Sequence, residues 1–188
     1  MRKLLKQAVL LNVWLTILCG LLYPAAMTGL AQALFPRQAN GSLISVGGKA
    51  VGSALIGQAF ADPKFFRGRP SAAGGGYDPL NSGGSNLGPT SKALVERVDK
   101  DARAARKAFG LTGPLPADMV TASASGLDPD VSPETALAQV PAVAKARGLD
   151  EAKVRALVEA HVEGRALGFL GEPRVNVLKL NLALAGLK

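Results

Sequence analysis

Residues 8–35 read AVLLNVWLTILCGLLYPAAMTGLAQALF, an uncharged and largely apolar run that decides how the chain is organised. A helix rises about 1.5 Å per residue, so a helix of this length crosses the roughly 30 Å hydrocarbon core of a bilayer. The run therefore predicts a transmembrane helix. It divides the chain into residues 1–36, which hold the N-terminal start and the helix, and residues 37–188, which are expected to form one further domain.

A cleaved signal peptide is the main alternative to a permanent membrane helix. Such a signal has an apolar stretch of about 7–15 residues before a small-x-small cleavage site. Ala31-Gln32-Ala33 fits the site, but the apolar run before it is longer than a typical signal. A lipoprotein anchor at Cys19 would need small residues before it, whereas Ile17 and Leu18 are bulky. The length of the run favours a membrane helix.

Basic residues flank the run unequally. Arg2, Lys3 and Lys6 precede it, and only Arg37 lies close to its other end. Because positively charged flanks stay on the cytoplasmic side, we expect the N-terminus in the cytoplasm and residues 37–188 outside. The sequence thus predicts a single-pass protein with an extracytoplasmic domain.

A face of polar and small residues interrupts the apolar run. Lipid offers polar groups no hydrogen bonds, and small residues let a neighbouring helix come close. We therefore expect a partner helix to pack against Asn12, Thr16, Gly20 and Tyr23. An isolated anchor that tolerates these residues is the alternative.

The remaining residues predict a mixed α+β fold. Strands and extended segments are expected at residues 43–46, 49–56, 119–124 and 175–184. A Gly47-Gly48 turn joins the first two strands, and a turn is expected at 126–133. In the last strand apolar and polar residues nearly alternate, which is typical of a half-buried strand.

Helices are expected at residues 91–109, 133–146 and 150–163. Gly110 marks the end of the first helix, and Ser132 followed by Pro133 marks the start of the second. Pro141 is expected to kink or split that helix, because proline has no backbone N–H. The glycine- and serine-rich stretch 71–90 is long for a connection, and long ordered loops are often functional.

Composition narrows the classes of function. The net charge is +8; apart from Arg2, Lys3 and Lys6 at the start, the excess positive charge is spread along the chain and not gathered into a basic patch, and aromatic residues make up only 5%. Both features argue against nucleic-acid binding. The chain has one cysteine, so it can form neither an intrachain disulfide nor a cysteine-based metal site.

No set of residues predicts catalysis or a metal site. His161, the only histidine, lies in an expected helix beside apolar positions, and we expect it to be a packed or surface residue and not a catalyst. Residues 128–132 resemble the start of a calcium loop, but proline and glutamine stand where that loop needs glycine and glutamate. Residues 83–90 have the glycine spacing of a phosphate-binding loop, but Pro89 stands where its lysine belongs.

Several blocks of sequence resemble one protein family. They are ANGSLI (39–44), GSALIGQ (52–58), GRPSA (68–72), SGGSNL (82–87), VTASASGLD (120–128), VPAVAKAR (140–147), and VNV (175–177) with LNLAL (180–184). In this order they are similar to the C subunit of the bacterial potassium-transporting ATPase, the Kdp complex. The resemblance runs along essentially the whole chain and is least distinct at residues 96–116.

The resemblance implies an accessory subunit of the plasma (inner) membrane with no catalytic site of its own. Its partners would be a channel-like potassium-translocating subunit, a P-type ATPase subunit and a small single-helix subunit. The complex would import potassium with high affinity when potassium is scarce, and the polar face of the membrane helix would contact the translocating subunit. No firmly bound cofactor is implied, since ATP would act through the pump subunit.

The family is described as a catalytic chaperone that raises the ATP affinity of the pump subunit. Its proposed nucleotide contact falls here on Ser82, Gly83, Gly84, Ser85 and Asn86. The expected topology places these residues outside, whereas ATP is cytoplasmic. We therefore expect the outer domain to stabilise the complex near the potassium entrance and to influence ATP affinity indirectly. An exported enzyme on a signal anchor and an extracytoplasmic binding module or sensor are the alternatives.

Overall fold

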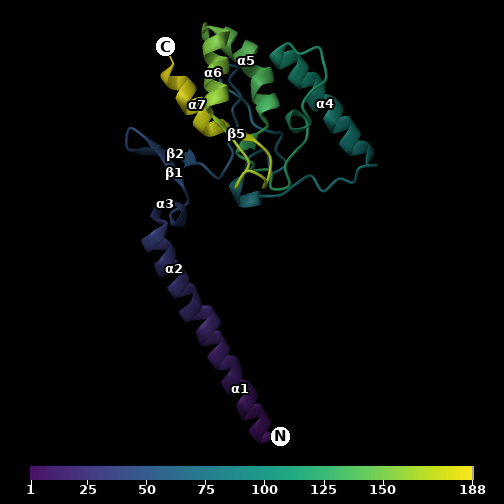
Figure 1. Ribbon diagram of the computed structural model, residues 1–188. Helices are drawn as coiled ribbons and strands as arrows, with labels where there is room; N and C mark the ends of the chain where they lie inside the picture. The colour runs from purple at the N-terminus through teal and green to yellow at the C-terminus, as the bar shows by residue number, and fades with distance from the viewer. Residues whose placement is uncertain (188) are drawn as a thin grey trace. The chain divides into compact units, whose positions relative to one another are not determined.

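The computed structural model describes residues 1–187 (Figure 1). Contacts divide the chain into two compact units, Met1–Val51 and Gly52–Lys188. The first unit holds a long apolar helix and the second holds helices and short strands. The expected mixed α+β class is therefore confirmed, while the expected boundary between residues 36 and 37 stays a prediction.

A 33-residue helix, Arg2–Leu34, makes up most of the first unit. It consists of α1 (Arg2–Ile17), a π-helical turn (η1, Leu18–Leu22) and α2 (Tyr23–Leu34). Pro24, the second residue of α2, has no backbone N–H. The π-helical turn, after which the Tyr23 N–H bonds to the Leu18 carbonyl, ends two residues before it. The most apolar window of the helix has a mean hydropathy of 1.9 and is not buried. By length and composition the helix can cross a membrane, as the sequence predicts.

A β-hairpin follows the short helix α3 (Pro36–Ala39). Its strands are β1 (Leu43–Val46) and β2 (Lys49–Ser53). Gly47 and Gly48 turn between them with φ of +58° and +80°, the left-handed backbone of a tight hairpin turn. The hairpin is confirmed, but β2 ends at Ser53 and not at residue 56. The Ser53 hydroxyl accepts a hydrogen bond from the Leu55 N–H at 3.1 Å and starts a turn there.

The second unit combines a small sheet with helices (Figure 1). The central strand β5 (Arg174–Asn176) is antiparallel to both β3 (Asp130–Val131) and β4 (Val162–Glu163). The helices are α4 (Lys92–Phe109), α5 (Pro133–Arg147), α6 (Glu151–Ala160) and α7 (Val177–Gly186). Two 3₁₀ turns, η2 (Pro79–Asn81) and η3 (Ala117–Met119), lie in the connections.

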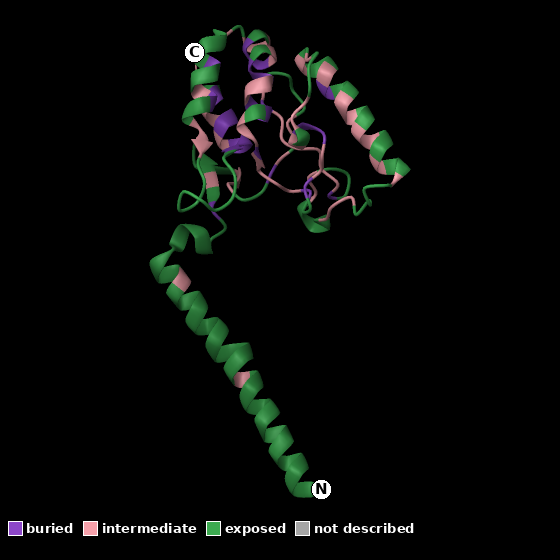
Figure 2. Cartoon of the chain, turned by 45° about the vertical axis from the view of Figure 1, so that its right-hand side comes forward, coloured by how far each residue is buried: buried purple, intermediate pink, exposed green. Residues whose placement is uncertain are grey.

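The main core lies among α5, α6, α7 and β5. It includes Phe66, Val140, Val143, Val154, Val158, Val175, Leu180 and Leu184. Figure 2 shows the buried positions gathered on these elements. A smaller cluster, Ala105, Met119 and Val120, joins α4 to the residues that follow it. Burial of this apolar surface is the main force that holds the second unit together.

The expected strand at 175–184 is wrong, because most of this segment is the helix α7. Asn176 ends β5, and its side-chain oxygen accepts a hydrogen bond from the Lys179 N–H at 3.1 Å, which caps the helix. Val177, Leu180 and Leu184 then share the buried face at helical spacing. The leucine spacing fits the two-residue period of a strand as well as the 3.6-residue period of a helix. The Asn176 cap favours the helix.

Three further expectations are corrected within the second unit. The helix expected to reach residue 163 ends at Ala160, where the His161 ring nitrogen Nδ1 lies 2.8 Å from the Leu157 carbonyl. The expected extended segment 119–124 contains no strand, and β3 lies instead in the expected turn, where it pairs with the distant β5. Pro141 does not split α5, which runs unbroken from Pro133 to Arg147 with Pro141 exposed on its surface, and the expected kink stays a prediction.

Candidate functional site

Two buried side-chain amides hold the chain at Phe66 and Arg67. Asn181 on α7 accepts a hydrogen bond from the Phe66 N–H at 2.8 Å and donates one to the Phe66 carbonyl at 2.9 Å. Gln139 on α5 bonds to the N–H and carbonyl of Arg67 in the same way, at 2.7 and 3.0 Å. The two amides are 3% and 1% exposed, so water does not compete for these bonds. We call Gln139 and Asn181 the amide clamp.

Beyond the clamp, Arg69 ties its loop to residues 121–128. Its guanidinium Nη1 lies 3.0 Å from the Asp128 carboxylate, and Nε donates to the Thr121 carbonyl at 3.3 Å. The two charged side chains are 25% and 28% exposed. A partly buried pair that also satisfies a backbone carbonyl positions a loop more firmly than an exposed pair does.

Tyr77 and Ser71 close the same loop on itself. The Tyr77 hydroxyl donates to the Arg69 carbonyl at 2.7 Å, and the Tyr77 N–H donates to the Ser71 hydroxyl at 2.8 Å. That hydroxyl donates in turn to the Gly126 carbonyl at 2.6 Å. Burial, and next the nearby Asp128 carboxylate, raise the pKa of Tyr77 to about 12. The phenol therefore stays neutral and acts as a hydrogen-bond donor, not as a base.

Glycines let the loops approach one another closely. Gly126 has φ of +66°, and a Cβ there would lie 2.6 Å from the Ala73 nitrogen. A Cβ at Gly84 would lie 2.9 Å from the Ala124 carbonyl oxygen. Three segments, 67–77, 82–86 and 121–128, thus pack backbone against backbone, and we call them the loop cluster.

The segment Ser82–Asn86, where the resemblance places a nucleotide contact, is one side of this cluster. The Ser82 hydroxyl and the Gly83 N–H both donate to the Ser125 carbonyl, at 3.0 and 2.9 Å. These two donors are therefore used within the fold. The segment has no charged side chain. Contact with a phosphate would depend on its remaining backbone donors and on the side chains of Ser85 and Asn86.

A separate group of charged side chains surrounds β4 and β5. Glu163 accepts a hydrogen bond from Lys179 at 2.8 Å and lies 3.0 Å from Arg174, and these contacts, led by Lys179, lower the pKa of its carboxyl. Asp130 also pairs with Arg174, at 3.3 Å, but burial raises the pKa of the Asp130 carboxyl. His161 lies with Glu163 and Lys179 around a cavity of about 170 Å³. Because the charges pair with one another, the group is a structural ion network.

In the described part of the chain, no cluster of His, Cys, Asp and Glu side chains is arranged to hold a metal ion. Comparison with known proteins then identifies the chain. The KdpC family model, described as K+-transporting ATPase, c chain, matches residues 5–186. The chain belongs to the KdpC family.

Full-length relatives agree with this assignment. The potassium-transporting ATPase KdpC subunit of Koribacter versatilis is 56% identical over 187 residues, 99% of this chain and 96% of its own. The KdpC subunit of Allorhizobium ampelinum is 58% identical over 96% of this chain and 94% of its own. The KdpC subunit of Geobacter sulfurreducens is 56% identical over 97% of both chains. As a KdpC chain, the protein is a subunit of a potassium-transporting ATPase, which implies partner subunits and association with a membrane.

The residues expected to face a partner helix are all exposed on the long helix of this KdpC chain. They are Asn12, Thr16, Gly20 and Tyr23. The Thr16 hydroxyl donates to the Asn12 carbonyl at 2.8 Å, so it is satisfied within the helix. Contact of this face with a partner stays a prediction.

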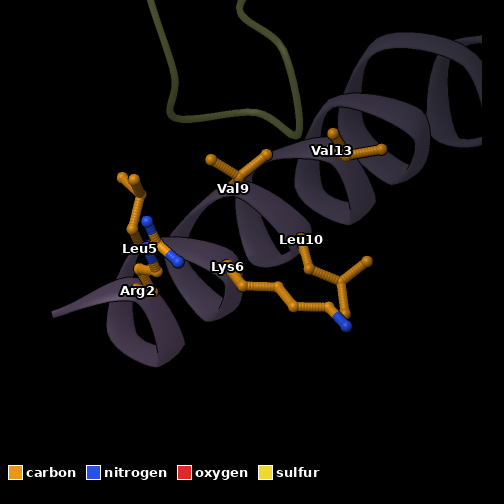
Figure 3. Close-up of a pocket in the computed structure, with 6 residues that line it drawn as sticks. All are labelled: Arg2, Leu5, Lys6, Val9, Leu10 and Val13. Atoms are coloured by element: carbon orange, nitrogen blue, oxygen red, sulfur yellow. The ribbon is translucent and has the colours of Figure 1, made fainter.

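The first turns of the same helix combine basic and apolar side chains. Figure 3 shows a shallow hollow there, lined by Arg2, Leu5, Lys6, Val9, Leu10 and Val13. All of these residues belong to α1, so the hollow is a groove on the surface of one helix. Basic residues at the end of an apolar helix suit the boundary between a bilayer and water.

Local sequence patterns indicate no role for the amide clamp, for Arg69 or for Tyr77. One signal was available for the clamp, since Asn181 interrupts a leucine-rich run and a polar side chain on an apolar helix face indicates a buried hydrogen bond. The partners of the clamp cannot be predicted from local sequence patterns, because they lie 115 and 72 positions away along the chain.

Proposed function

We propose that this chain is a non-catalytic accessory subunit of an ATP-driven potassium importer. Arg2–Leu34 anchors it in the membrane, and the second unit stabilises the complex and promotes the use of ATP by the pump subunit. The observation that carries the proposal is the long, unburied apolar helix in a chain of the KdpC family. An apolar surface of this extent requires lipid or a partner protein.

The proposal includes specific partners and an orientation. The partners are a channel-like potassium-translocating subunit, a P-type ATPase subunit and a small single-helix subunit. The names of the relatives, subunits of a potassium-transporting ATPase, support this kind of assembly. Arg2, Lys3 and Lys6 before the apolar run support an N-terminus in the cytoplasm and a second unit outside the inner membrane.

The effect on ATP is proposed to be indirect. The Ser82 hydroxyl and the Gly83 N–H donate to the Ser125 carbonyl, which leaves fewer donors for a phosphate. An outer-face location would also separate the Ser82–Asn86 segment from cytoplasmic ATP. The loop cluster would then act by holding its partner subunit in the state that binds ATP more tightly.

A pull-down tests the role as a subunit. The full-length chain, tagged at its C-terminus, is extracted from native membranes in mild detergent, and the proteins that accompany it are identified by mass. We expect a P-type ATPase subunit and a channel-like subunit. Recovery of the chain alone and folded would instead favour a freestanding binding module or sensor and would refute the proposed role.

The polar face of the membrane helix can be tested in the same preparation. Asn12→Leu with Gly20→Leu removes a polar group and fills the space that a small residue leaves, so we expect the complex to loosen. Leu21→Ala, on the far side of the helix, is the control and should have little effect. Full recovery of the partners with the double variant would count against this seam.

Protease protection tests the orientation, and kinetics tests the route to ATP. A protease added outside spheroplasts should remove the second unit, whereas cleavage only from the cytoplasmic side would overturn the outer location.

Alanine at Ser85 and Asn86 should leave the KM for ATP of the intact complex unchanged if the effect is indirect. A several-fold rise in this KM with an intact complex would support direct contact.

A further inference from the structure

The connection between β4 and β5 exposes three large apolar side chains. Leu167, Phe169 and Leu170 are 83%, 68% and 50% exposed. They fall within four consecutive residues, so they form a contiguous apolar tip and not scattered surface positions. A tip of this kind on a chain that works with other subunits marks a contact site.

The backbone of this tip is held by its own hydrogen bonds. The N–H groups of Ala166 and Leu170 each donate to the carbonyl of the other, at 2.9 Å. The Gly168 N–H donates to the Arg165 carbonyl at 3.1 Å, and the Arg165 guanidinium pairs with Glu172 at 2.6 Å across the base. The apolar side chains are therefore presented in one shape before any partner arrives.

Leu167 adopts a conformation that leucine disfavours. Its φ is +53°, in the left-handed region where glycine or asparagine is usual. A loop that only joined two strands would be more stable with one of those residues at this position. Strain that keeps a large apolar side chain in solvent indicates a function for that side chain.

The charges around the tip favour a protein partner over lipid. A loop that inserts into a membrane is usually flanked by unpaired basic residues that meet anionic headgroups. Here Arg165 pairs with Glu172, and Arg174 pairs with Glu163 and Asp130. A loop can insert into lipid chains without a fixed backbone shape, whereas it must have a defined shape to fit a pocket on a protein.

We propose that Leu167, Phe169 and Leu170 insert into an apolar pocket on another subunit of the potassium-transporting ATPase. This inference rests on the proposed role of the chain as a pump subunit. It does not depend on the seam along the membrane helix. It gives the second unit a contact of its own with the complex, in addition to the anchor.

The first test is Leu167→Asn. Asparagine tolerates a positive φ but has no apolar side chain. The loop therefore keeps its backbone shape, while the apolar tip loses its most exposed side chain. With the full chain in the detergent-extracted complex, we expect retention by the other subunits to weaken on the order of tenfold. We expect thermal stability to stay equal or to rise.

Matched variants sharpen this test. Phe169→Ser should weaken retention in the same way. Val95→Asn removes a side chain on α4 that is 57% exposed and should leave retention unchanged. Equal retention of Leu167→Asn, Phe169→Ser and wild type would overturn the proposal. If the wild-type chain itself retains no other subunit, the proposed function fails together with the loop proposal. If the wild-type chain retains the other subunits and the loop variants retain them equally well, the loop proposal alone fails.

A photo-crosslink identifies what the tip touches. Benzoylphenylalanine in place of Phe169 keeps an aromatic ring at the tip and reacts with its neighbours on illumination of the purified complex. We expect an adduct with a subunit of the potassium-transporting ATPase. An adduct with lipid or with a second copy of this chain, or no adduct in an intact complex, would overturn the proposal.

Discussion

Replacing Asn181 with leucine tests how the amide clamp holds the chain at Phe66. Leucine has a similar size, but it can neither accept a hydrogen bond from the Phe66 N–H nor donate one to the Phe66 carbonyl. Phe66 is 1% exposed, so water cannot replace the lost bonds. The variant therefore leaves two buried backbone groups without partners.

The expected magnitude follows from these two groups. A buried backbone group without a partner costs about 1–3 kcal/mol, so the pair costs about 2–6 kcal/mol. The added apolar side chain offsets roughly 1 kcal/mol of this. We expect a net loss of about 3 kcal/mol, a large fraction of the 5–15 kcal/mol of a typical domain. At about 3–4 °C per kcal/mol, the Tm of the second unit falls on the order of 10 °C.

The assay is thermal unfolding of the full-length chain in detergent, followed by circular dichroism, with pulse proteolysis as a second readout. Asn81→Leu is the control, because Asn81 is exposed and its amide donates to the Asp78 carboxylate in its own loop. It should change stability by less than about 1 kcal/mol. Combining Asn181→Leu with Gln139→Leu should cost less than the sum of the two single changes, because both hold adjacent residues.

An Asn181→Leu chain that unfolds within about 0.5 kcal/mol of wild type would contradict this role of the amide clamp. That result would mean that packing of the Phe66 ring alone holds this loop. Strictly additive losses in the double variant would show instead that the two clamp residues act independently of each other.

Three other substitutions test the loop cluster and its surroundings. Gly126→Ala should destabilise by about 1–3 kcal/mol in urea unfolding, because its Cβ would meet the Ala73 backbone at 2.6 Å; wild-type stability would contradict this close approach. The pKa of Tyr77 is raised from 10.0 to about 12, so the unfolded chain ionises first and stability falls between pH 10 and pH 12, on the order of 1 kcal/mol after screening. Tyr77→Phe should remove this part of the pH dependence, and an unchanged slope would show that the phenol plays no part in it. Asp118→Ala removes the carboxylate that accepts three hydrogen bonds at the start of α5 and should lower the Tm by several degrees; calorimetry that shows no change would contradict this role.

Local signals in the sequence were sufficient for much of the fold. The uncharged run of residues 8–35 indicated the long helix, Gly47-Gly48 the hairpin turn, and Ser132 with Pro133 the start of α5. Each is a short-range effect of side-chain chemistry on its own backbone. The end of α4 at Gly110, with φ of +68°, belongs to the same class.

Long-range contacts explain what the sequence analysis missed. The strand β3 has two residues and exists because β5 pairs with it, and α7 was mistaken for a strand because its leucines also alternate. The amide clamp joins segments far apart in the chain, so neither of its partners could be read from a local pattern. The segment Ser82–Asn86 was identified by resemblance, but only the structure shows that Ser125 takes two of its donors.

The amide clamp also sets an order of events while the chain is being made. Phe66 and its partner on α7 are 115 positions apart. At roughly 5–20 residues per second, a ribosome needs about 6–23 s to add the intervening residues. Until Gln139 is added, the segment after Phe66 lacks both residues of the clamp, and until Asn181 is added it still lacks one. Residues 2–34 are thus made well before the clamp can form, and a chain that stops short of α7 leaves the N–H and carbonyl of Phe66 without their Asn181 partner.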